Sequence, residues 1–351
     1  MQLPIRIVDG LVEERLVSVD GAWGQPGLSL SHWPGNATPA ELRHDLSTGI
    51  ALAFARLPAA RRRELAAGCV AIANNHVDTD GACALFAVRH PEAALARADQ
   101  LLEAAWAGDF FRAPSERAVA LDLVVGGLYD AQRSPWNARF AGLDDRERRE
   151  FVTLELVGRW AEILDGDLIE FADLWRAGLE SFAADRADLA RAQRDELVHL
   201  DAAVFTAPEG AASSRPRADA TNFDPGRHAL FGATSADRVF VVGPRGAGAT
   251  YRLVIGTGSW FDLVSGPKLP RPDLAALAAR LNALEGTEPC AQAAWRAQPV
   301  ATPSPELWFG RRDAELFAEH APWLETSRLA PRTVKSAVFD ALRAAWAFPG
   351  E

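Results

Sequence analysis

The sequence predicts an α/β fold in which an N-terminal sheet, flanked by many helices, is followed by a second, smaller α/β domain. A short apolar run at 69–75 leads through a polar tip into an alanine-rich, helix-like segment at 82–88, as expected of an α/β crossover. From 91 to 200 the pattern is helical, and strand-like runs return beyond it. This alternation predicts helices packed on a sheet.

A change in composition divides the chain. Residues 208–222 are small, polar and include proline, which is typical of a loop or linker. We therefore expect a first domain, including the helical half, over 1–207. A linker is expected over 208–222 and a smaller α/β domain over 223–351.

The composition is that of an ordinary folded protein. The 351 residues are 48% hydrophobic and 24% charged, which excludes a disordered or collagen-like chain. A formal net charge of −10 argues against duplex nucleic acid as a partner. Three cysteines without CxxC spacing give neither a disulfide framework nor a zinc cluster. The sequence has neither a signal peptide nor an apolar run of about 18 residues, so we expect a cytoplasmic protein without a membrane partner.

In the N-terminal domain, strands are expected at 4–8 and 28–33. A helix is expected to open at Thr38-Pro39, because threonine caps helix N-termini and proline suits the first helical position. The run at 200–207 is expected to add another strand to the same sheet. The apolar face of the predicted helix repeats every four residues, at Leu42, Leu46, Ile50 and Phe54.

In the smaller domain, strands are expected at 237–243 and 251–256, joined by the glycine-rich stretch 243–248. A phosphate-binding loop would need a lysine and a helix after this stretch, so we interpret it as a hairpin turn. Helices are expected at about 272–286 and 332–347, because each has an apolar stripe at helical spacing.

The clearest functional pattern is His76-Val77-Asp78-Thr79-Asp80-Gly81, which directly follows the predicted strand at 69–75. Alternate residues of an extended segment project to one side, so His76, Asp78 and Asp80 can converge at a strand end, where open α/β folds bind ligands. Carboxylates with one imidazole suit Mn²⁺, Fe²⁺ or Mg²⁺. The alternative is a turn in which both aspartates only cap the next helix.

A strand followed by HVDTDG resembles the first motif of the DHH phosphoesterase superfamily, over residues 69–110. The resemblance implies two α/β domains, a dinuclear Mn²⁺ site and hydrolysis of a phosphoester or phosphoanhydride. It also implies a further aspartate that bridges the ions, to which we match Asp109. The chain departs from the family pattern in lacking both an Asp-His-His triplet, for which His199-Leu200-Asp201 is the closest substitute, and a glycine-glycine-glycine-histidine signature.

A second polar cluster follows the strand expected at 28–33. His32 is a candidate ligand and catalytic residue, Asn36 a candidate hydrogen-bond donor to substrate, and Asp45 a candidate metal ligand or a support for one. The alternative is that Trp33-Pro34-Gly35 is only a packed turn and that His44 and Asp45 are solvated.

Candidate substrate-binding residues come from both domains. Asn75, beside the HVDTDG motif, joins Asn36 in the first. In the second, Arg245, Arg252 and Arg271 are candidates for holding an anionic substrate, because guanidinium matches phosphate and carboxylate.

Together these residues predict a metal-dependent hydrolase of a phosphoester or related small anionic substrate, in which metal-activated water attacks. The expected cofactor is Mn²⁺, with Fe²⁺ or Mg²⁺ as alternatives, in one or two ions. The catalytic candidates are His76, Asp78, Asp80 and His32. The metal-ligand candidates are His76, Asp78, Asp80, Asp109, Asp45 and His199.

Two other functions fit the same residues. One is a divergent manganese or iron enzyme with non-hydrolytic chemistry in small-molecule metabolism. The other is a binding protein that keeps the scaffold without catalysis. The sequence leaves the substrate and the oligomeric state open, a homodimer included.

Overall fold

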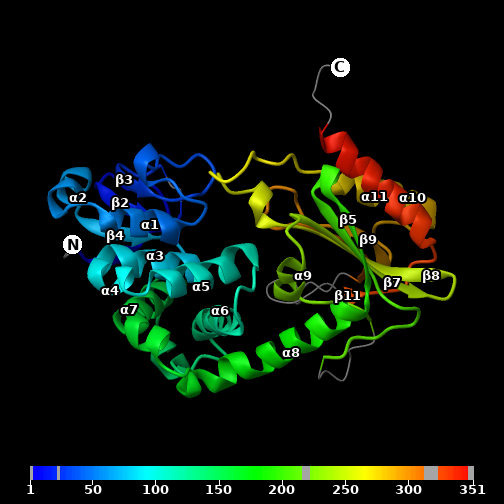
Figure 1. The fold of residues 1–351 in the computed structure, drawn as a ribbon, viewed down its shortest axis with the longest axis horizontal. Coiled ribbons are helices and arrows are strands. Elements are labelled where there is room, and N and C mark those ends of the chain that lie inside the picture. Colours follow the sequence, from blue (N-terminus) through cyan, green and yellow to red (C-terminus); the bar gives the residue numbers. More distant parts are fainter. Residues whose placement is uncertain (1–2, 22–23, 216–221, 312–322, 347–351) are drawn as a thin grey trace. The chain divides into compact units, whose positions relative to one another are not determined.

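The chain has a mixed α/β fold, as the sequence predicts, and forms two compact units. The first unit contains Met1–Leu179 and Phe261–Lys268, and the second contains Glu180–Trp260 and Leu269–Glu351. Figure 1 shows the helices and strands of both units. The computed structural model describes residues 3–21, 24–215, 222–311 and 323–346.

The boundary between the units lies within α8 (Ala172–Arg191), earlier than the predicted boundary at 207. The run expected to extend the first sheet forms β6 (Ala202–Thr206), which pairs in parallel with β7 (Arg238–Arg245) in the second unit. That expectation was wrong because an apolar run reveals a strand but not its neighbour. The predicted linker at 208–222 therefore lies inside the second unit, and its residues 216–221 are outside the described part.

In the described part of the first unit, four strands form one parallel sheet in the order β1-β4-β2-β3. Because every strand runs the same way, the residues that follow β2, β3 and β4 emerge at one edge of the sheet. This edge carries the candidate site. The strands are β1 (Ile5–Ile7), β2 (Leu16–Val19), β3 (Gly27–Leu30) and β4 (Ala71–Asn74).

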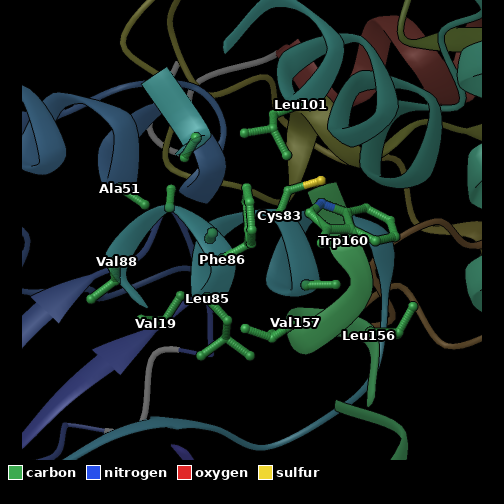
Figure 2. Packing of buried hydrophobic residues seen from close by; sticks show 14 of the residues in the cluster. Val19, Ala51, Cys83, Leu85, Phe86, Val88, Leu101, Leu156, Val157 and Trp160 are labelled. Atoms are coloured by element: carbon green, nitrogen blue, oxygen red, sulfur yellow. The ribbon is translucent and has the colours of Figure 1, made fainter. Parts of the chain in front are cut away.

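The helix after β4 is the centre of the first unit's core. Ten of the eleven residues of α3 are buried, and Figure 2 shows Cys83, Leu85 and Phe86 packed with Trp160 and other side chains of the apolar cluster. A helix enclosed on all sides is a rigid support for a site at its N-terminus. The helices here are α1 (Ser47–Arg56), α2 (Ala59–Leu65), α3 (Thr79–Arg89), α4 (Pro91–Leu95), α5 (Ala98–Phe110), α6 (Glu116–Tyr129) and α7 (Asp145–Asp165).

Helix α1 begins at Ser47, nine residues after the predicted cap Thr38. The Thr38 hydroxyl instead donates to the Ser31 carbonyl and accepts from the Ser31 amide, so it fastens the chain that follows β3. Leu42 and Leu46 are nevertheless buried as the apolar repeat predicts. The repeat identified the buried positions correctly but not where the helix starts.

In the second unit, the described strands form a sheet in the order β11-β10-β8-β7-β6-β5, with β9 on β10. The glycine-rich stretch is a hairpin turn between β7 and β8 (Gly248–Ile255), as predicted. The other strands are β5 (Gln193–Leu197), β9 (Ala293–Ala297), β10 (Glu306–Arg311) and β11 (Trp323–Leu324). The helices are the C-terminal part of α8, α9 (Arg227–Ala233), α10 (Leu274–Glu285) and α11 (Pro331–Trp346).

The two helices predicted near the C-terminus are present as α10 and α11. The predicted apolar stripe of each helix is buried except at its C-terminal end. There Leu284 of α10 is 49% exposed and Trp346 of α11 is 40% exposed. None of the helices in the described ranges combines the length and apolarity needed to cross a membrane.

A buried ion network in the second unit gives a stability prediction. Glu306 accepts from Arg252 at 2.7 and 2.8 Å and from Arg227 at 2.6 and 3.0 Å. Burial opposes its charge, but Arg252 outweighs burial and lowers the pKa of Glu306 to about 2. We expect Glu306→Gln to lower the free energy of unfolding by about 3 kcal/mol, because it removes the buried carboxylate charge that two guanidinium groups share and leaves Arg252 with Asp224 alone. Urea titration at neutral pH measures this.

The matched control is Glu325→Gln, which breaks the more exposed pair with Arg311 and should cost about 1 kcal/mol or less. The pKa of Glu306 is lower in the folded state than its ordinary value of 4.5. Its contribution is therefore complete above pH 4.5 and is lost as the pH falls from 4.5 towards about 2. Equal unfolding midpoints for the two variants would contradict the prediction.

Candidate metal centre

Aspartate and histidine side chains from separate elements of the first unit meet at the carboxyl edge of its sheet. Asp20 follows β2, and His32 lies two residues after β3. Asp20 has a left-handed backbone, with φ 63°, which aspartate adopts more readily than most residues. Asp80 lies in the first turn of α3, and Asp109 in the last turn of α5.

Four of these residues form a buried ligand set. The set comprises Asp20, His32, Asp80 and Asp109, which offer ligand atoms that all lie within 4.8 Å of one another. His32 Nε2 lies 3.0 Å from Asp109 Oδ2, 3.6 Å from Asp80 Oδ2 and 3.7 Å from Asp20 Oδ1. Three carboxylates around one imidazole are close enough to bind a metal ion.

A second, more exposed ligand set shares Asp20 with the first. Its members are Asp20, His76 and Asp78. His76 Nε2 lies 3.0 Å from Asp20 Oδ2 and 2.8 Å from Asp78 Oδ2. The side chains of His76 and Asp78 are 27% and 36% exposed, so solvent reaches this set.

The HVDTDG motif contributes to both sets, and its geometry differs from the prediction. Asp78 and Asp80 do not alternate along a strand, because Asp78 is the N-cap of α3 and Asp80 is already helical. Asp78 Oδ1 accepts from the Gly81 amide at 2.8 Å while its Oδ2 faces His76. The helix-capping alternative is therefore correct for Asp78 Oδ1. Asp78 Oδ2 takes no part in the cap and can serve as a metal ligand.

The N-terminus of α1 holds the carboxylates of Asp80 and Asp20 through hydrogen bonds. The amides of Ser47 and Thr48 each donate to the Asp80 carboxylate at 2.8 Å. The Ser47 hydroxyl donates to Asp20 Oδ1 at 2.8 Å, and the Trp33 indole donates to the same oxygen at 3.1 Å. Amides at a helix N-terminus stabilise negative charge, so they help hold two neighbouring carboxylates together.

Burial and mutual repulsion perturb the ionisation of the buried set. Burial, followed by the charge of Asp20, raises the pKa of Asp80 to about 6. Burial, followed by the charge of Asp80, raises the pKa of Asp109 well above its usual range. Burial works to lower the pKa of His32, but Asp109 outweighs it and raises that pKa to about 9. A cation among these groups would relieve the repulsion between the carboxylates.

The chemistry of the two imidazoles fits a metal. His32 Nδ1 contacts the Asp45 carbonyl oxygen at 2.5 Å, and His76 Nδ1 contacts Asn75 Oδ1, so an oxygen acceptor holds Nδ1 of each ring. This arrangement directs both Nε2 atoms at carboxylates, as in metal-binding histidines. His32 Nε2 and Asp20 Oδ2 are buried and make no hydrogen bond. Their nearest ion-pair partners, Asp109 Oδ2 and His76 Nε2 respectively, each lie at 3.0 Å.

A distant stretch of sequence completes the first unit at this site. Phe261–Lys268, here called the docking segment, belongs to the first unit although the residues on both sides belong to the second. The Phe261 ring stacks on His32 with a centroid separation of 3.8 Å. The amides of Val264 and Ser265 donate to Asp45 Oδ1 at 2.7 and 3.0 Å.

Five predicted ligand or catalytic residues are thus brought together, and two predicted ligands are not. Asp45 belongs to neither ligand set, because its carboxylate binds the docking segment and its carbonyl contacts His32. Its contacts are those expected of a residue that supports a candidate ligand. His199 lies in the short 3₁₀ helix Val198–Leu200 of the second unit and is also in neither set.

The predicted substrate-binding residues have other contacts in the structure. Asn36 closes the turn after Trp33, and Asn75 contacts His76. In the second unit, Arg252 is buried against Glu306 and Asp224, and Arg271 donates to the carbonyls of Val300, Thr302 and Pro303. Arg245 donates to the Ala211 carbonyl at 3.5 Å. Arg252 and Arg271 therefore stabilise the second unit rather than present free guanidinium groups.

Sequence reasoning missed Asp20, the residue common to both sets. Its signal was the mostly apolar run Leu16–Val19 followed by Asp20 and a glycine, an order of strand and then acidic residue that β4 and its motif also have. It also missed Phe261, for which no local signal exists.

Residues 9–350 of the chain match a family model that is described as a family of unknown function, DUF6687. The chain therefore belongs to this family. No curated protein and no solved structure matches it. The resemblance to the DHH phosphoesterase superfamily stays a prediction.

Proposed function

We propose that this protein is a metal-dependent hydrolase of a small anionic substrate, such as a phosphoester, with Mn²⁺ as its resident ion. The proposal depends on one observation, the sharing of Asp20 by two ligand sets. Asp20 Oδ1 lies 3.7 Å from His32 Nε2, and Asp20 Oδ2 lies 3.0 Å from His76 Nε2. One carboxylate therefore faces both sets and suits a pair of bridged ions.

The donor atoms favour manganese over its alternatives. Carboxylate oxygens suit Mg²⁺ and Mn²⁺, whereas imidazole suits iron and other transition metals. Each set combines at least two carboxylates with one imidazole. This mixture supports Mn²⁺ first, with Fe²⁺ and Mg²⁺ as the other candidates.

The difference in burial between the sets suggests a division of roles. His32, Asp80 and Asp109 would hold an ion out of contact with solvent, while His76 and Asp78 would hold one that substrate and water can reach. When bound, such ions polarise a phosphoryl oxygen and lower the pKa of a coordinated water. The Trp33 ring, 5.1 Å from the His76 ring, would flank a substrate on the accessible side.

The test is a screen of small phosphomonoesters and phosphodiesters with chelator-treated protein, before and after addition of Mn²⁺. We expect turnover that requires the metal and falls at least about 100-fold in Asp78→Asn, because metal-assisted charge stabilisation is worth several kcal/mol. The control Asp165→Asn removes only an exposed ion pair with Arg97 and should keep wild-type turnover. Absence of turnover in Mn²⁺-loaded wild-type protein on every ester would overturn the proposed reaction.

The same assay separates the hydrolase from a redox metalloenzyme. Hydrolysis is indifferent to dissolved oxygen, so we expect equal rates in air-saturated and anaerobic buffer. Turnover that requires oxygen would instead favour non-hydrolytic manganese or iron chemistry. Stoichiometric metal without any turnover would favour a non-catalytic binding protein.

A further inference from the structure

The docking segment Phe261–Lys268 contacts the buried ligand set through backbone and side chain together. Its Asp262 amide donates to the His32 carbonyl at 2.8 Å, and Asp262 Oδ2 accepts from the Gly35 amide at 3.0 Å. These two bonds fix the segment to the loop that carries His32. They leave the His32 imidazole free to face the carboxylates.

Asp45 is the second anchor of the docking segment. Its Oδ1 accepts from two successive amides, Val264 and Ser265, and hydrogen bonds to a charged acceptor are stronger than neutral ones. The carbonyl of Asp45 contacts His32 Nδ1 at 2.5 Å. One residue therefore holds both the segment and the imidazole that the segment covers.

Phe261 covers the buried set. Its ring lies nearly parallel to the His32 ring, at an interplanar angle of 18°, and its centroid is 5.5 Å from that of Phe110, the neighbour of Asp109. Phe261 is 5% exposed, and the side chains of His32 and Asp80 are fully buried. An ion at this set can enter or leave only if some covering group moves.

We infer that the docking segment gates the buried ion, with Asp45 as the anchor that holds it closed and Phe261 as the positioning residue that packs on His32. Docking of the segment sets the rate at which this ion exchanges with solution. The exchange of the ion at His76 and Asp78 does not depend on whether the segment is docked. The inference rests on the proposed metal centre and does not depend on the hydrolytic reaction.

The experiment measures release of Mn²⁺ from the loaded, full-length protein to a chromogenic chelator in a stopped-flow instrument. Wild-type protein should show a fast phase from the exposed set and a slow phase from the buried set. In Asp45→Ala and Phe261→Ala the slow phase should accelerate at least about tenfold, since each change removes contacts that hold the segment closed. The fast phase should not change.

Two variants separate gating from general loss of structure. Asp45→Asn keeps an oxygen acceptor for the two amides, so its slow phase of Mn²⁺ release should have nearly the wild-type rate. If Asp45 instead bound the metal through its charge, the slow phase of Asp45→Asn would be as fast as that of Asp45→Ala. Val264→Ala changes a side chain that is 55% exposed and keeps the amide that Asp45 binds, so it should match wild type.

Hydrogen exchange of the metal-free protein gives a readout that does not need an ion. The amides of Asp262, Val264 and Ser265 should lose protection in Asp45→Ala while those of α3 keep it. If wild-type protein releases Mn²⁺ in two phases and Asp45→Ala leaves both release rates unchanged, only the gate is overturned. If wild-type protein binds no metal, the gate and the proposed metal centre both fail, and the exchange data show whether the segment is docked.

Discussion

Asp20→Asn should abolish stoichiometric metal binding at both ligand sets. Asp20 is the member that the sets share, and an amide nitrogen in place of Oδ2 cannot serve as a ligand. We expect affinity to fall by more than the roughly 10- to 100-fold typical of residues that only support a ligand. Elemental analysis of protein purified without chelator or affinity metal measures the bound metal per chain.

Single-set variants provide the comparison. Asp109→Asn should remove only the buried ion and Asp78→Asn only the exposed one, because each belongs to one set. The control variant Asp165→Asn, at an exposed aspartate outside both sets, should bind as much metal per chain as the wild type. Asn also tolerates the left-handed backbone that Asp20 adopts, so the chain should remain folded, which circular dichroism checks. Loss of one ion alone in Asp20→Asn would contradict the shared role.

Gly81→Ala should disrupt the centre without changing any ligand. A Cβ atom at this position would overlap Asn74 Nδ2 and lie 2.8 Å from Asp78 Oδ1 and 3.1 Å from Asp20 Oδ2. The helix cannot easily retreat, because α3 is enclosed in the core and Asp78 caps it through the Gly81 amide. We expect affinity for Mn²⁺ to fall about 10- to 100-fold, as measured by titration calorimetry.

The control for this variant is Gly126→Ala. Gly126 lies in α6, where an added Cβ meets nothing within 4 Å. Alanine is favoured over glycine in a helix by about 0.5–1 kcal/mol, so this variant should be slightly more stable and bind metal as wild type does. Equal metal affinity in the two variants would show that the close approach at Gly81 does not matter.

Of the six residues in the two ligand sets, the sequence analysis named all but Asp20 as candidates, and its clearest signal came from three that lie close together in the chain. His76, Asp78 and Asp80 follow one apolar strand, so hydrophobicity and residue type together revealed them. The reason given for their convergence, alternation along an extended segment, was wrong. The capped first turn of α3 separates Asp78 and Asp80 into different ligand sets.

The rest of the site depends on pairings that the sequence does not specify. β2 and β4 are adjacent in the sheet but are separated in the chain by β3, a short 3₁₀ helix and two α-helices, so nothing local connects Asp20 with His76. For a related reason, the sequence could not decide whether Asp45 is a ligand or supports one. Its acidic side chain was apparent, but its partners are amides from far along the chain, which only the fold brings to it.

The return of Phe261–Lys268 to the first unit affects how the protein can be divided for experiments. A fragment that ends at Leu179 would contain every proposed metal ligand yet lack the aromatic ring against His32 and both amides bound by Asp45. A fragment that ends at 207 would, in addition, carry β5 and β6 without β7. Loss of metal from either fragment would therefore not place a ligand in the C-terminal half. Supplying the missing octapeptide in trans is the natural complementation experiment.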